Sequence, residues 1–260
     1  MKMNFHKYQG TGNDFVVMDN RQGTFPKNDT KLVAWLCDRR FGIGGDGLLL
    51  LEDDKMSDFR MVYFNADGAA GSMCGNGGRC LVAFAHKLGI IGEHTDFIAV
   101  DGPHSATVLG EEVELRMGNV DKVHQRDNYS FLDTGSPHHV QMVKDLDGLD
   151  VNREGRRLRY GLYGQKGSNI NFVEPLEPGS FRVRTYERGV EAETLSCGTG
   201  VTAVAIAMHR LGMTKSGPVR IRTMGGDLSI RFQEREGRYE EVYLTGPAKE
   251  VFKGEVEWSI

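Results

Sequence analysis

A segment that occurs twice constrains this chain more than any other feature. Cys74-Gly75-Asn76-Gly77 begins the first copy, and Cys197-Gly198-Thr199-Gly200 begins the second, 123 positions later. Further residues follow the two cysteines at the same distances: Leu88-Gly89, Ile98 and Gly102 in the first copy, and Leu211-Gly212, Ile221 and Gly225 in the second. A period this long excludes a solenoid of short repeats. The sequence therefore predicts an internal duplication of a strand-cysteine-helix-strand unit, and so two homologous halves.

Both cysteines stand directly before a helical pattern of apolar residues. Each pattern ends at the Leu-Gly pair, which is a typical C-terminal stop. A thiol at a helix N-terminus faces unpaired backbone N–H groups and the positive end of the helix dipole, which lower its pKa and favour thiolate. The glycines leave room for an anionic group to approach those N–H groups. A buried cysteine that only caps a core helix is the alternative, but two matched copies favour a functional role.

Composition narrows the classes of protein that this chain can represent. The 260 residues carry a net charge of −4 with no long run of either sign, so nothing indicates nucleic acid or an anionic membrane. No apolar stretch approaches the ~18–20 residues of a membrane-spanning helix, and residues 1–8 lack the apolar part of a signal peptide. We expect a cytoplasmic protein with reduced thiols. The four cysteines do not have zinc-site spacing, so we expect no metal.

The first 60 residues predict strands at 3–8 and 14–19, followed by a helix from Asp29-Thr30 to about Arg39. Residues 42–47 match the pattern G-x-G-x-x-G. A dinucleotide fingerprint must follow a strand and open a helix, whereas this segment follows a helix and enters the strand-like residues 48–51. We interpret it as a tight loop.

Each half places a polar turn between a strand and its cysteine. In the first half, strand 61–64 leads to Asn65, and in the second half, strand 181–186 leads to Glu187-Arg188. An exposed ion pair is the alternative for Glu187 and Arg188, but their place before the second cysteine favours a role in binding. The chemistry of the two halves is therefore expected to differ.

Alternating residues after each helix predict half-buried antiparallel strands near 96–117 and 218–244. Residues 119–132 look like an irregular crossover, residues 152–159 like a short basic helix, and residues 251–260 like a last strand. His138 and His139 are adjacent and so point in different directions, which makes them a poor metal pair; packing or hydrogen bonding is the alternative for both.

One thiolate and one thiol on opposite sides of a carbon suit stereoinversion. The thiolate removes a proton from one face, and the thiol returns a proton on the other. An amino acid α-hydrogen is weakly acidic unless a cofactor accepts the electrons or the developing charge is stabilised electrostatically. Two helix N-termini directed at the substrate carboxylate would supply that stabilisation, and exclusion of water would strengthen it.

The whole chain resembles the diaminopimelate epimerase family of pyridoxal-independent two-cysteine epimerases. The resemblance rests on seven motifs: Gly10-x-Gly12-Asn13-Asp14-Phe15, Gly42-x-Gly44-x-Asp46-Gly47, Phe64-Asn65-Ala66-Asp67-Gly68, Cys74-Gly75-Asn76-Gly77-x-Arg79-Cys80, Tyr186-Glu187-Arg188-Gly189, Cys197-Gly198-Thr199-Gly200 and Gly246-Pro247-Ala248. It implies a cofactor-independent isomerase that interconverts LL- and meso-diaminopimelate in lysine and peptidoglycan-precursor biosynthesis. It also implies a homodimer.

The implied fold is α+β, with two pseudo-symmetric domains that each wrap a mainly antiparallel sheet around a central helix. The active site is expected in the cleft between the domains. We place the N-terminal half at residues 1–121, with residues 250–260 returning to it as a last strand, and the C-terminal half at 122–249.

The resemblance also implies roles for single residues. Cys197 would take the α-proton of the LL substrate, and Cys74 would donate a proton on the other face. The expected substrate-binding residues are Asn13, Asn65, Gly75, Asn76, Ser136, His138, Asn169, Glu187, Arg188, Gly198 and Thr199. Arg188 suits a bidentate pair with the distal carboxylate. Ser136 departs from the family, since many members have asparagine there.

Three other readings stay open. Proline racemases share the fold and a cysteine pair, but they characteristically have histidine where this chain has Asn76, and Arg188 indicates a second carboxylate on the substrate. Phenazine-biosynthesis isomerases share the fold but lack the cysteine pair. A redox switch that controls a binding function is the alternative from another class, and it would need oxidation for activity.

Overall fold

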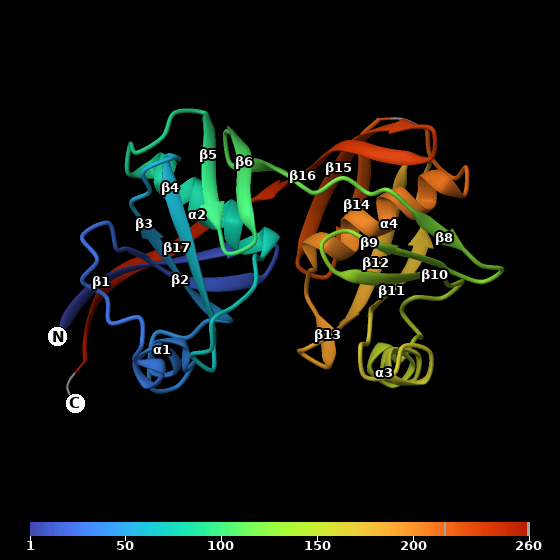
Figure 1. Ribbon diagram of the computed structural model, residues 1–260. Helices are drawn as coiled ribbons and strands as arrows, with labels where there is room; N and C mark the ends of the chain where they lie inside the picture. Colours follow the sequence, from blue (N-terminus) through green and yellow to red (C-terminus); the bar gives the residue numbers. More distant parts are fainter. Residues whose placement is uncertain (216, 259–260) are drawn as a thin grey trace. The chain divides into compact units, whose positions relative to one another are not determined.

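The computed structural model describes residues 1–215 and 217–258. The chain forms two compact units, one made of Met1–Leu115 with Gly246–Ile260 and the other of Arg116–Thr245. Each unit has its own sheet and its own central helix (Figure 1). Over the described residues, no helix is long and apolar enough to cross a membrane.

The first unit contains a mainly antiparallel sheet of eight strands. Its strands are β1 (Lys2–Gly10), β2 (Asn13–Asp19), β3 (Gly47–Glu52), β4 (Phe59–Asn65), β5 (His94–Ala99), β6 (Gly102–Leu109), β7 (Glu112–Arg116) and β17 (Lys249–Glu257). They pair in the order β17-β1-β2-β3-β4-β5-β6-β7, and only the β2–β3 and β4–β5 pairs are parallel.

Helix α2 (Gly75–Lys87) packs inside this sheet, and helix α1 (Thr30–Cys37) covers part of its outer face. Both faces of the sheet are covered at strand β3, because its leucines 48–51 are all fully buried. Alternate residues of a strand point to opposite faces. Leu48 and Leu50 accordingly join Leu32 and Leu36 of α1 in one cluster, while Leu49 lies against α2 at Gly77. The central strand is therefore a continuous apolar run.

The second unit repeats this arrangement. Its strands are β8 (Val123–Gln125), β9 (Ser130–Asp133), β10 (Pro137–Met142), β11 (Asn169–Pro175), β12 (Ser180–Glu187), β13 (Ala192–Thr194), β14 (Val219–Thr223), β15 (Gly226–Arg235) and β16 (Arg238–Pro247). The main pairing order is β8-β9-β10-β11-β12-β14-β15-β16, again with only two parallel pairs, β10–β11 and β12–β14. The short strand β13 adds to β12.

Helix α4 (Gly198–Arg210) takes the place of α2, and helix α3 (Val151–Gly161) packs on β11, β12 and β13. Ten of the residues of α4 are buried, among them Val201, Val204 and Met208. The apolar residues from Val201 to Met208 form one core cluster with residues of the surrounding strands such as Phe181 and Ile221. A helix that is apolar on nearly all sides suits a position enclosed by a sheet.

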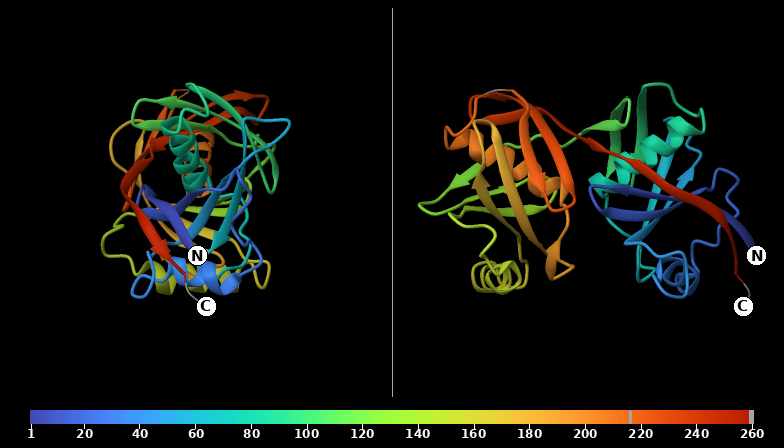
Figure 2. Two further views of the ribbon diagram at one scale, coloured as in Figure 1. Left: turned by 90° about the vertical axis from the view of Figure 1, so that its left-hand side faces the viewer. Right: turned by 180° about the vertical axis from the view of Figure 1, so that it is seen from behind.

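The two sheets differ in the origin of one edge strand. In the second unit, β8 comes directly before its neighbour β9. In the first unit the equivalent place beside β1 is taken by β17, at the other end of the chain (Figure 1, Figure 2). The last strand of the protein therefore completes the sheet of the first unit.

The predicted α+β architecture, with a mainly antiparallel sheet around a central helix in each half, is confirmed. Asp29 caps α1 as expected, since its side chain accepts a hydrogen bond from the Leu32 N–H group. The expectation of an irregular crossover at 119–132 was wrong, because this segment contains β8 and β9. Strand β8 pairs with β9, and β9 pairs with β10 as well; both strands are too short, at three and four residues, for an alternating pattern to reveal them.

Candidate active site

Cys74 is the N-cap residue of α2. Its backbone is extended, with φ −114° and ψ 119°, and its side chain makes no capping hydrogen bond. Side chains of Phe15, Leu49 and Met61 lie close under Gly77 in the first turn, at the distances where a Cβ atom would make contact. Cys74 thus stands at an N-terminus whose first turn packs directly on the sheet.

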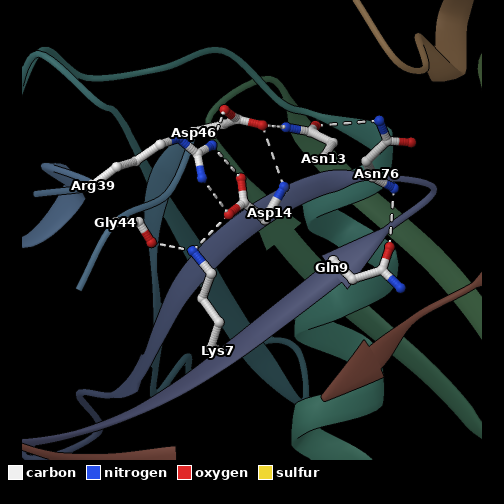
Figure 3. Close-up of polar contacts among 9 residues, drawn as sticks. Lys7, Gln9, Asn13, Asp14, Arg39, Gly44, Asp46 and Asn76 are labelled. Carbon is white, nitrogen blue, oxygen red and sulfur yellow. Dashed lines mark hydrogen bonds and ion pairs between the residues drawn. The ribbon is translucent and has the colours of Figure 1, made fainter. Parts of the chain in front are cut away.

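Asn13 connects Cys74 to its surroundings. The Cys74 thiol donates to Asn13 Oδ1 at 3.6 Å, and Asn76 Nδ2 donates to the same oxygen at 3.2 Å. On its other side, Asn13 Nδ2 donates to Asp46 Oδ2 at 2.7 Å. Figure 3 shows Asn13 between Asp46 and Asn76. Because Asp46 can only accept, the amide of Asn13 must turn its oxygen toward Cys74.

Charged residues hold the loop that carries Asp46. Arg39 donates to both oxygens of Asp14 and to Asp46, and Lys7 forms an ion pair with Asp14 at 2.7 Å (Figure 3). Burial opposes ionisation of Asp14, but its hydrogen bonds with Arg39 and Lys7 outweigh burial and lower its pKa to about 2. This network fixes the loop and, through Asp46, the orientation of Asn13.

Arg79 supports the first turn of α2 from inside the unit. It is fully buried, and its Nη2 donates to Asn76 Oδ1 at 3.1 Å and to Thr11 Oγ1 at 3.4 Å. With its oxygen occupied by Arg79, the Asn76 amide directs its nitrogen toward Asn13. The residues around Cys74 therefore form one connected set.

Cys197 is the N-cap residue of α4 and has the same extended backbone, with φ −127° and ψ 110°. Its sulfur lies 3.5 Å from Thr199 Oγ1, and Thr199 Oγ1 lies 2.9 Å from His138 Nε2. The backbone oxygen of Thr199 accepts a hydrogen bond from Thr134. Cys197 is itself 8% exposed, so its sulfur is largely withdrawn from solvent within this unit.

His138 lies on β10 and is completely buried. Asn171 Nδ2 donates to its Nδ1 at 3.1 Å. Burial lowers the pKa of His138 to about 3, and the charge of Arg188 acts in the same direction. His138 is therefore a neutral imidazole near neutral pH.

Arg188 lies in the turn after β12 and contacts two predicted binding residues. Its Nη2 donates to Ser136 Oγ at 3.2 Å, and its backbone N–H donates to Asn169 Oδ1 at 2.8 Å. Asn169 Nδ2 donates to Ser136 Oγ at 3.0 Å. Glu187, next to Arg188, accepts a hydrogen bond from Thr194 at 2.8 Å. Ser136 thus accepts hydrogen bonds from both Arg188 and Asn169.

The predicted residues form two groups, one in each unit. The first unit brings together Cys74, Gly75, Asn76 and Asn13, while Asn65 is exposed at the end of β4. The second unit brings together Cys197, Gly198, Thr199, His138, Asn169, Ser136 and Arg188, with Glu187 adjacent.

Sequence reasoning missed Asn171, although a signal was present. Asn169 and Asn171 are separated by one residue on a strand, so their side chains share a face. Asp46 was recognised only as part of a glycine-rich motif; its role as an acceptor for Asn13 required the structure.

The other two cysteines have different surroundings. Cys37 and Cys80 are both buried, and burial raises the pKa of each thiol to about 12. Neither thiol can ionise near neutral pH. Cys37 ends α1 and Cys80 lies inside α2, so of the four cysteines only Cys74 and Cys197 stand at a helix N-terminus.

Comparison with known proteins gives the family. The family model described as diaminopimelate epimerase matches residues 5–123 and 130–251. The diaminopimelate epimerase of Flavobacterium psychrophilum is 56% identical over 96% of this chain and 99% of its own length, and that of Chlorobaculum tepidum is 46% identical over 95% and 98%.

Solved structures show the same fold at low identity. A phenazine biosynthesis protein of the PhzF family from Bacillus anthracis has a TM-score of 0.81 at 13% identity, with 99% of this chain and 100% of that chain covered. A probable proline racemase from Agrobacterium radiobacter has a TM-score of 0.68 at 16% identity, with 99% and 93% covered. Because the fold is shared by several chemistries, the matched motifs and the identity to named relatives decide: this chain belongs to the diaminopimelate epimerase family.

Proposed function

We propose that this protein interconverts LL- and meso-2,6-diaminopimelate without a cofactor, by a two-base mechanism that uses Cys74 and Cys197. One observation carries the proposal: the two cysteines occupy the same N-cap position on the central helices of two units with the same strand order. The full-length identity to named diaminopimelate epimerases supports this substrate.

The reaction transfers two protons. The Cys197 thiolate takes the α-proton of the LL isomer, and the electron pair of the broken C–H bond stays on the substrate. The Cys74 thiol then donates its proton to the opposite face of the carbon, and this electron pair forms the new C–H bond. Cys197 is left as a thiol and Cys74 as a thiolate, the state that acts on the meso isomer in the reverse direction. Exchange with water restores the starting state.

The helix N-termini would stabilise the charge that develops on the substrate carboxylate. The side chains of Cys74 and Cys197 make no capping bond. The first backbone N–H groups of a helix have no acceptor within that helix. The first turns of α2 and α4 contain those of Gly75, Asn76, Gly198 and Thr199. Oriented backbone donors need no reorganisation during reaction, so they favour the transition state over the ground state. This requires both units to face one substrate carbon.

Arg188 would hold the distal carboxylate in a bidentate pair. Its contacts with Ser136 and Asn169 support this role, because they place three predicted binding residues in one polar group. Glu187 would bind an ammonium group, and Asn13 and Asn65 would add contacts from the first unit. A substrate with only one carboxylate would leave the Arg188 guanidinium without its partner.

Assembly and location form part of the same proposal. We expect a homodimer in the cytoplasm. Strand β17 supports an assembly surface, since it forms an edge of its sheet and exposes Val251 and Phe252. Pairing or covering such an edge with a second copy is a common solution for exposed strands.

Chiral chromatography after incubation with LL-diaminopimelate tests the proposal. The reduced protein, without added pyridoxal phosphate, should form the meso isomer and should be insensitive to a carbonyl reagent. Proline and hydroxyproline serve as parallel substrates and should be unchanged. Turnover of proline but not diaminopimelate would replace the proposed function by that of a racemase, and activity only after oxidation would favour a redox switch.

A further inference from the structure

The residues under the two cysteines are the clearest difference between equivalent positions of the units. Gly77 and Gly200 occupy the same place in the first turns of α2 and α4. Side chains of Phe15 and Leu49 lie under Gly77, whereas Asn171 Oδ1 and the side chain of Cys197 lie closest to Gly200. The parallel pairs β2–β3 and β10–β11 align Phe15 with His138, and Leu49 with Asn171. An apolar pair in one unit is thus a polar pair in the other.

The orientation of the Asn171 amide follows from its neighbours. Asn171 is fully buried. Its Nδ2 lies 2.9 Å from the backbone oxygen of His139, which can only accept, and its Oδ1 accepts from Thr185 Oγ1 at 3.0 Å. The nitrogen must therefore be the atom that also faces His138.

This orientation selects the tautomer of His138. Nδ1 faces the amide nitrogen of Asn171 and has to be an acceptor. In a neutral imidazole the hydrogen then sits on Nε2. Asn169 Nδ2 lies 3.5 Å from Nε2, but its hydrogens are directed to nearer acceptors, Ser136 Oγ and the Pro137 oxygen. The positive charge of Arg188 opposes the binding of a second proton to the His138 ring.

This series of hydrogen bonds ends at the sulfur of Cys197. His138 Nε2–H donates to Thr199 Oγ1, so the hydroxyl hydrogen of Thr199 is directed to the sulfur, 3.5 Å away. A sulfur that receives a hydrogen bond is favoured as thiolate. We propose that Asn171 is a positioning residue that, through the His138 tautomer and the Thr199 hydroxyl, holds Cys197 as the thiolate of the resting enzyme. This inference rests on the proposed function, for which Cys197 is the base toward the LL isomer.

Cys74 has the opposite arrangement. Its thiol donates to Asn13 Oδ1, an oxygen held in place by the bond from Asn13 Nδ2 to Asp46. An acceptor beside a sulfur favours the protonated thiol. The two units therefore favour one thiolate and one thiol, the starting state required for reaction on the LL isomer.

Alkylation of the substrate-free enzyme tests the inference without reference to turnover. The rate of iodoacetamide reaction would be measured for each cysteine by peptide mass spectrometry across a range of pH. In the wild type, Cys197 should react at lower pH than Cys74. Asn171→Leu, which places the residue of the first unit at this position, should slow Cys197 alkylation near neutral pH by about tenfold, equal to a rise of about one unit in its pKa, and leave Cys74 unchanged.

Substitutions at two positions of α4 give a matched comparison. Thr199→Val removes the hydroxyl that faces the sulfur and should have the same effect as Asn171→Leu, while Thr199→Ser should restore the wild-type profile. Thr202→Val makes the same change on the same helix, but the Thr202 hydroxyl donates to the Gly198 oxygen, so Cys197 should react as in the wild type. An unchanged Cys197 profile in folded Asn171→Leu and Thr199→Val would overturn the inference.

The tautomer of His138 can be observed directly in the wild type. Nitrogen-15 NMR distinguishes Nδ1-H from Nε2-H in histidine, and loss of one signal set in His138→Gln assigns the ring. We expect hydrogen on Nε2; hydrogen on Nδ1 would contradict the inference. A protein that shows this tautomer and alkylation profile but does not epimerise diaminopimelate would refute the proposed function alone.

Discussion

The unit of Cys74 and the unit of Cys197 have the same strand order, the same central helix and a cysteine at the same N-cap, yet the side chains around the two sulfurs differ in kind. In the first unit the polar contacts of Asn13 extend to a charged network near the surface, and the positions under the helix are apolar. In the second unit, a series of buried hydrogen bonds runs from Asn171 through His138 and Thr199 to the sulfur of Cys197. The two units thus share a frame that holds a thiol at a helix N-terminus, and the inferred protonation preferences of the two thiols follow from the different side chains around them.

The largest expected effect tests whether both units are needed. Cys74→Ala and Cys197→Ala should each lower kcat by about 10²–10⁴-fold in both directions, the range that positioned acid–base groups contribute. Circular dichroism should show an intact fold, since each cysteine caps a helix without a side-chain hydrogen bond. Either variant with near-wild-type turnover would show that one half works alone.

Arg188 has no counterpart in the first unit, where the equivalent strand ends at Asn65 and is followed by Ala66. Arg188→Met should raise the KM for diaminopimelate by about 10–100-fold, the value of a hydrogen bond to a charged group, with a smaller change in kcat. Arg153→Met, at an exposed arginine of α3, is the control and should leave both constants unchanged. Unchanged KM in Arg188→Met would remove this residue as the distal anchor.

A polar residue should be tolerated under the cysteine of only one unit. Leu49→Asn would bury an amide among Phe15 and Met61 and should lower the free energy of unfolding by about 1–3 kcal/mol, the cost of an unpaired buried polar group. Urea denaturation measures this. Leu109→Asn, at a half-exposed leucine of β6, should change stability by less than about 1 kcal/mol. Equal effects at both sites would mean that the apolar position under Gly77 accepts a polar group.

Acid sensitivity should be larger for the second unit, because its buried histidines resist protonation. Burial lowers the pKa of His138 to about 3 and of His139 to about 4, from 6.5 for an exposed histidine. The unfolded chain therefore binds protons that the folded chain does not, so this contribution to stability is complete above about pH 6.5 and is lost as the pH falls toward 4. Each histidine contributes a slope of up to about 1.4 kcal/mol per pH unit.

Replacement of one histidine isolates its share of that slope. His138→Gln should make the free energy of unfolding less dependent on pH between about 6.5 and 4, while His139 continues to contribute. Urea unfolding at several pH values gives the two curves. Parallel curves for the variant and the wild type would show that His138 is not buried in its neutral form.

Local features of the sequence were sufficient to predict the frame of the site. The duplicated Cys-Gly-x-Gly segments placed both cysteines at helix starts, because glycine punctuation and apolar periodicity act over a few residues. Asp29 was recognised as a cap for the same reason. Helix α1 ends at Cys37, slightly before the expected Arg39, because Asp38 adopts an extended backbone with φ −67° and ψ 125°.

Features that depend on tertiary contacts were not predictable. Strands β8 and β9, three and four residues long, are too short for their own patterns to reveal them; they form by pairing with each other and, for β9, with β10. The role of Asn171 depends on an amide orientation set by the His139 backbone and by Thr185, residues that no local pattern connects. Asn171, the residue proposed to orient His138, lies outside the seven family motifs.

Deuterium incorporation from D2O tests the central claim most directly. Reduced enzyme would be incubated with LL-diaminopimelate, and product and recovered substrate would be separated at low conversion. If two different cysteines act on opposite faces, the meso product carries one deuterium at the inverted carbon while the recovered LL substrate carries almost none. Deuterium in the recovered LL substrate at a level similar to the product, or meso product without deuterium, would contradict the assignment of one proton transfer to each unit.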